Sequence, residues 1–63
     1  MQAEIHEQNG KQYLVLTLEL DQAAPLSKSG KTRVVASTRG NQVTAAQFKG
    51  QPITVGVNAY IKA

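Results

Sequence analysis

The amino-acid sequence predicts a small all-β domain, and three features of the chain support this fold class. Apolar and polar residues alternate with a period of two over long stretches, as in strands with one buried face. Short segments containing Gly, Asn or Pro separate these stretches at regular intervals. The chain has 63 residues, which is enough for one domain, residues 1–63. We therefore predict about five antiparallel strands, closed or nearly closed into a small SH3-like or OB-like barrel.

The first two strands are expected at residues 2–8 and 11–21, on either side of Asn9-Gly10. A type I′ turn needs positive φ at both central residues, and Asn-Gly supplies this with little strain. Four leucines alternate along the second strand and are expected on its buried face: Leu14, Leu16, Leu18 and Leu20. The pattern predicts a β-hairpin.

The other three strands are expected at residues 31–39, 42–48 and 52–62, after a longer connection over residues 22–30. The tight turns between them are expected at Gly40-Asn41 and at Lys49-Gly50-Gln51-Pro52. The alternation is weak in the fourth segment, where Ala45-Ala46-Gln47 has one helical turn as an alternative.

The predicted core consists of apolar residues on the inner strand faces: Ile5, Leu14, Leu16, Leu18, Leu20, Val34, Ala36, Val43, Phe48, Ile53, Val55, Val57 and Ile61. A chain of 63 residues can bury only a small core, so burial of further surface would help the fold. We predict a homodimer, joined by strand edges or by an apolar face that includes Val15 or Val35.

Charge is unevenly distributed along the chain. All four acidic residues lie among residues 1–21, where with Lys11 they give a net charge of −3. Residues 22–63 contain six basic residues and no acid, a net charge of +6. This half can pair with the acidic end of its own chain, with a second subunit or with an anionic ligand. An ordinary solvated basic surface is the alternative.

Several classes of protein do not fit the sequence. The absence of cysteine excludes a disulfide scaffold, a thiolate metal site and a cysteine nucleophile. His6 is the one imidazole, and no serine has a signature of activation, so we expect no enzyme, cofactor or metal. No stretch approaches the roughly 20 apolar residues of a membrane span. Residues 1–4 lack the features of a signal peptide, and we expect a cytoplasmic protein without a membrane partner.

The segment Gly30-Lys31-Thr32 matches the end of a phosphate-binding P-loop. The first glycine of that motif is replaced by Pro25, and a strand rather than a helix is expected to follow. A nucleotide-hydrolase site is therefore not expected. A loop rich in Ser, Gly and Lys can instead hold one phosphate of a polymer, and a solvated connection is the alternative.

Period-two alternation predicts one basic face on the third strand, with Lys31, Arg33 and Arg39 sharing it. If Tyr60 and Lys62 lie on the same outer face, the tyrosine offers a surface on which a base can stack. The expected nucleic-acid-binding residues are Lys28, Lys31, Arg33, Arg39, Tyr60 and Lys62. We predict a non-catalytic protein that binds single-stranded nucleic acid without sequence preference. The alternative is a structural or protein-interaction module whose basic half pairs with an acidic partner or a second subunit.

Three strings stand out within residues 25–62: Pro25-Leu26-Ser27-Lys28-Ser29-Gly30-Lys31-Thr32, Val34-Val35-Ala36-Ser37-Thr38 with Gly40-Asn41, and Val55-Gly56-Val57-Asn58-Ala59-Tyr60-Ile61. Together they resemble small uncharacterised bacterial and prophage-borne all-β proteins, and this resemblance implies no activity. The loop Ser27-x-Ser29-Gly30-Lys31 entering a strand is also similar in style to basic loops of small phage single-stranded-DNA-binding proteins.

Overall fold

The computed structural model describes all 63 residues, Met1–Ala63, and contains six strands and no helix. The strands are β1 (Gln2–Gln8), β2 (Lys11–Thr17), β3 (Thr32–Ser37), β4 (Gln42–Phe48), β5 (Gln51–Val55) and β6 (Asn58–Lys62). They pair antiparallel in three two-stranded sheets, β1 with β2, β3 with β6 and β4 with β5. The all-β prediction is confirmed, and residues 42–48 form a strand without a helical turn. Since the chain has no helix, none could span a membrane.

The first hairpin forms as predicted. Asn9 and Gly10 both have positive φ, 53° and 75°, and β1 and β2 pair without any irregularity in register. The second strand ends at Thr17, earlier than the predicted residue 21. Beyond Thr17 the chain leaves β1 and reaches β3 at Asp21.

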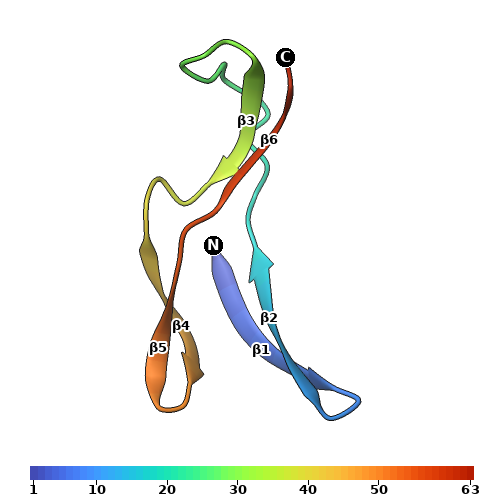
Figure 1. The fold of residues 1–63 in the computed structure, drawn as a ribbon, viewed down its shortest axis with the longest axis vertical. Helices are drawn as coiled ribbons and strands as arrows, with labels where there is room; N and C mark the ends of the chain where they lie inside the picture. The colour runs from blue at the N-terminus through green and yellow to red at the C-terminus, as the bar shows by residue number, and fades with distance from the viewer.

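The remaining strands build one long, interrupted hairpin. Lys49 and Gly50, with φ of 51° and 76°, make the turn between β4 and β5. Beyond this pair, β3 and β6 continue the two arms of the ribbon (Figure 1). The predicted strand over residues 52–62 is interrupted at Gly56 and Val57, so the chain has six strands instead of five.

Thr38 bridges the interruption. Its backbone N–H donates to the Val57 carbonyl at 3.0 Å, and its hydroxyl accepts from the Val57 N–H at 3.0 Å. The same hydroxyl donates to the Gly40 carbonyl at 2.6 Å. The predicted Gly40-Asn41 turn does not reverse the chain. Arg39 and Gly40 have positive φ there, and the chain passes from β3 into β4 within the same ribbon (Figure 1).

The segment Asp21–Ser27 lies along the edge of β3 that does not pair with β6. It therefore forms a third extended segment beside β3 and β6. Leu26 and Arg33 form an isolated antiparallel bridge. Three backbone hydrogen bonds hold the segment: Asp21 N–H to Val35 O at 2.7 Å, Val34 N–H to Pro25 O at 2.9 Å and Ser27 N–H to Thr32 O at 2.9 Å.

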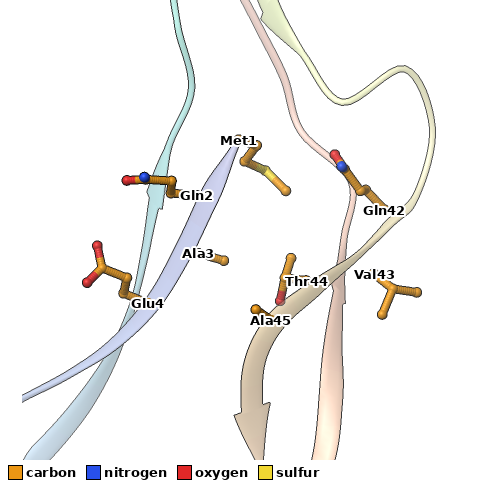
Figure 2. Close-up of a pocket in the computed structure, with 8 residues that line it drawn as sticks. All are labelled: Met1, Gln2, Ala3, Glu4, Gln42, Val43, Thr44 and Ala45. Atoms are coloured by element: carbon orange, nitrogen blue, oxygen red, sulfur yellow. The ribbon is translucent and has the colours of Figure 1, made fainter.

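No closed barrel is found. The β4 strand lies beside β1 without forming a ladder with it, and the β1–β2 and β4–β5 hairpins diverge away from the β3–β6 pair (Figure 1). An open cleft of about 450 Å³ separates Met1–Glu4 from Gln42–Ala45. In Figure 2, Met1 and Ala3 extend from β1 toward β4, whereas Glu4 and Val43 point away from the space between the strands.

Burial is sparse, and this corrects the predicted core. Three residues are buried, Ala36, Ala46 and Val55, of which Ala46 is not among the predicted core residues. Five predicted core residues are exposed: Leu14, Leu20, Val43, Phe48 and Ile61. The other six are half-buried: Ile5, Leu16, Leu18, Val34, Ile53 and Val57. A strand buries its apolar face only where a second layer covers it, and the diverging hairpins leave their faces largely open.

Candidate nucleic-acid interface

The β3–β6 end of the molecule brings basic residues from distant parts of the sequence together. The Ala63 N–H donates to the Lys31 carbonyl at 3.0 Å, and Lys62 lies opposite Thr32 in the ladder. Lys28 lies in the preceding turn, closed by a bond from the Gly30 N–H to the Ser27 carbonyl. In Figure 1 the loop before β3 and the C-terminus occupy the same end of the molecule. Lys28, Lys31 and Lys62 therefore belong to one end of the fold.

Hydroxyl groups shape the loop at this end. The Thr32 hydroxyl donates to Ser27 Oγ at 2.9 Å, and Ser27 Oγ lies 3.2 Å from Ser29 Oγ. The Lys31 N–H donates to Ser29 Oγ at 3.4 Å. Because Thr32 begins a strand, these groups do not open a helix, and the loop lacks the architecture of a P-loop.

Tyr60 and Lys62 lie on one face of the β3–β6 pair. Directly opposed residues in an antiparallel ladder share a face, and Tyr60 lies opposite Val34. Arg33 lies opposite Ile61 and therefore projects from the other face. The sequence left open whether Tyr60 and Lys62 share the outer face of Arg33, and the pairing register places them on the opposite face.

Arg33 also has a structural role. Its guanidinium donates from Nη1 to the Ala24 carbonyl at 3.1 Å. Ala24 has a positive φ of 43°, an uncommon conformation for alanine. The bond from Arg33 holds the segment that runs beside β3, so this side chain contributes to the stability of the fold.

The predicted basic stripe is broken by a β-bulge. The register shifts between Val34 and Ala36, leaving Val35 as the extra residue, and an extra residue reverses the alternation of faces beyond it. Ser37 consequently pairs with Asn58 on the face of Tyr60. Arg39 lies beyond the end of β3 and lines a hollow with the acidic residues Glu19 and Asp21. The structure therefore separates Arg39 from Lys28, Lys31 and Lys62.

The basic end thus consists of Lys28, Lys31 and Lys62. Tyr60 adjoins Lys62 on one face, and Lys31 precedes Thr32 and lies toward the opposite face, with Arg33. Tyr60 is 61% exposed. No Asp or Glu occurs in the loop 22–31, in β3 or in β6. The Ala63–Lys31 bond could not be predicted from the sequence, because pairing between residues so distant along the chain leaves no local pattern.

Other chemistry has little support in the side-chain arrangement. No three His, Cys, Asp or Glu side chains gather where they could hold a metal ion. His6 Nε2 lies 3.6 Å from Glu4 Oε2, and both side chains are more than half exposed. An exposed pair on one strand face is an ordinary surface contact.

Comparisons with protein-family models, with curated proteins and with solved structures found no match.

Proposed function

We propose that this chain is a small non-catalytic protein that binds single-stranded nucleic acid with little sequence preference. The observation that carries the proposal is that the fold brings Lys28, Lys31 and Lys62 to one end of the molecule, where the loop 22–31 and the strands β3 and β6 contain no Asp or Glu. Lysine binds phosphate as a point charge, and contacts to phosphate carry no sequence information. The basic end therefore suits a phosphate backbone of any sequence.

Tyr60 supplies the second element of the proposed site. It shares a face with Lys62 two residues away, a separation of about 7 Å along a strand. Its exposed ring is accessible without rearrangement of the fold. A base stacked on Tyr60 with its phosphate near Lys62 would combine the two interactions found in sequence-tolerant single-strand binders.

The proposal includes the cytoplasmic location expected from the sequence. It also agrees with the similarity between the loop Ser27–Lys31 and the basic loops of small phage single-stranded-DNA-binding proteins.

Titration of a fluorescently labelled oligothymidylate with the protein, followed by anisotropy, tests the proposal. Each neutralised phosphate of a single strand contributes a slope of about −0.7 in log affinity against log salt. Three lysine contacts predict a slope of about −2, so affinity falls roughly 20-fold between 50 and 200 mM salt. A flat titration at 50 mM salt and tens of micromolar protein would contradict the proposal.

Variants separate the two elements of the site. Joint replacement of Lys31 and Lys62 with Ala is expected to reduce the salt slope by about 1.4. The matched control removes Lys11 and Lys49, two lysines at the hairpin turns, and should leave the slope unchanged. Tyr60→Ala is expected to weaken binding by about 1–3 kcal/mol and to preserve the slope. Equal effects of the two double variants would show that only net charge matters.

A protein-interaction module is the second candidate, and one specific observation favours it. Large apolar side chains are exposed over much of the surface, and no large side chain is fully buried. This candidate predicts no binding to the oligonucleotide at low salt.

A further inference from the structure

The single chain exposes more surface than a compact protein of its size. Its accessible surface is 5215 Å², whereas a folded monomer of 6.8 kDa is expected to expose about 4,000 Å². Its radius of gyration is 14.2 Å, compared with about 10.6 Å for a compact chain of this length. The excess of roughly 1,200 Å² falls within the area that one subunit buries in an obligate homodimer.

Part of the open apolar surface lies on the two hairpins that diverge from the β3–β6 pair. Leu14 pairs with Ile5 and shares a face with Ala3, whose side chain extends toward β4 in Figure 2. Phe48 pairs with Gln51 and therefore shares a face with the buried Val55. Leu14 remains 40% exposed and Phe48 remains 47% exposed, although both lie on the apolar faces of their hairpins.

Charges beside these residues are complementary between the hairpins. Glu7 follows Ile5 on the apolar face of β1, and Lys49 adjoins Phe48 at the β4–β5 turn. The strands β4 and β5 contain no charged residue. Free edges are ordinarily protected against pairing by charged residues, and β4 has no such protection. In a twofold assembly in which the β1–β2 hairpin of each copy faced the β4–β5 hairpin of the other, Glu7 would face Lys49.

We infer that a second copy of this chain packs between the diverging hairpins, covers Leu14 and Phe48, and forms a twofold-symmetric dimer. The second copy packs between the turn ends of the two hairpins, beyond the part of β1 that lies beside β4. This specifies the predicted homodimer with different residues, since Val15 and Val35 are already half-buried within one chain. The inference does not depend on nucleic-acid binding.

Another apolar surface is less suited to this contact. Leu26 and Ile61 are exposed on the far face of the β3–β6 layer, but Arg33 lies between them in the register. Burial of that guanidinium would require a paired anion, and no acidic residue lies on this layer's strands β3 and β6.

Sedimentation equilibrium of the whole chain, from about 1 to about 100 µM, tests the assembly together with thermal unfolding over the same range. We expect a species of twice 6.8 kDa and a thermal midpoint that rises with protein concentration. A folded 6.8 kDa species with a constant midpoint would overturn the inference, and so would a trimer or an open-ended assembly.

Substitutions locate the contact. Leu14→Ser and Phe48→Ser are each expected to raise the dimer dissociation constant by at least about tenfold. Val43→Ser is the matched control, because Val43 is 65% exposed and points away from the gap (Figure 2). Its expected effect is less than about twofold. If Phe48→Ser unfolds the protein, Phe48→Leu replaces it with a smaller expected effect in the same direction. Equal effects of Val43→Ser and Phe48→Ser would place the contact elsewhere.

Charge reversal tests the pairing of the hairpins. Glu7→Lys and Lys49→Glu should each weaken the dimer several-fold, and the double variant should restore it to within about twofold. Glu4→Lys is the control, since Glu4 points away from β4 in Figure 2. Additive weakening in the double variant would contradict the proposed contact between Glu7 and Lys49. Oligonucleotide binding by a monomeric variant would separate this inference from the proposed function.

Discussion

The β1–β2 and β4–β5 hairpins have the same turn geometry but different strands beyond the turn. Asn9-Gly10 and Lys49-Gly50 have nearly identical φ values, 53° and 75° against 51° and 76°. The β1–β2 ladder is regular throughout, whereas the β4–β5 register shifts between Val43 and Gln47. A two-residue turn therefore specifies where the chain reverses. The register of the strands farther from the turn depends on other interactions.

Threonine hydroxyl groups take the place of ladder bonds where the second ribbon is irregular. The Thr44 hydroxyl donates to the Ile53 carbonyl at 2.8 Å and accepts from the Ala46 N–H at 3.3 Å. Thr38 has the same role between β3 and β4. The regular hairpin shows no such side-chain bond to its backbone. The long ribbon can thus bend without leaving its backbone groups unpaired.

The largest expected effect is that of Thr38→Val. The substitution leaves the Val57 N–H without its acceptor and the Gly40 carbonyl without its donor, so we expect a loss of about 1–3 kcal/mol in the free energy of unfolding. Urea unfolding at one fixed protein concentration measures it. Thr54→Val, at an exposed position on β5, is the control and should change stability by less than about 0.5 kcal/mol.

A smaller effect is expected from Thr44→Val, about 1–2 kcal/mol, because one of the two bonds lost is long at 3.3 Å. The equivalent change in the regular hairpin is Thr17→Val, at an exposed end of β2. We expect it to be nearly neutral in the same urea experiment. Similar losses at the two positions would mean that the irregular ladder does not depend on the hydroxyl.

The smallest effects are expected from exchanging the first turn residues. Asparagine tolerates positive φ better than lysine, so Lys49→Asn should stabilise the protein by about 0.5–1 kcal/mol and Asn9→Lys should destabilise it by a similar amount. Lys49 Nζ also lies 5.5 Å from the centre of the Phe48 ring, and loss of this cation–π contact reduces the gain. Thermal unfolding of both variants measures the difference. A net loss for Lys49→Asn would show that the contact outweighs the backbone strain.

Part of the candidate site follows directly from the sequence. The segregation of charge predicts a basic region, and the Ser-Gly-Lys composition predicts a polar loop there. The strand face on which each side chain lies cannot be predicted in the same way. The bulge at Val35 and the register of Tyr60 each shift the pairing by one residue. A shift of one residue moves a side chain to the opposite face of a strand. Arg33 therefore lies on the opposite face from Tyr60 and Lys62, and Arg39 lies beyond the end of β3.

Features that depend only on neighbouring residues could be predicted from the amino-acid sequence. The turns at Asn9-Gly10 and Lys49-Gly50 need only local positive φ, and the strands follow from period-two alternation. The pairing of distant segments depends on the packing of the whole chain, which sets the bulge at Val35, the break at Gly56 and the opening between the hairpins. These depend on which layer covers which face, and alternative registers of short strands differ little in local energy. Only the packing of the whole chain, together with a partner that covers its open faces, selects among these registers.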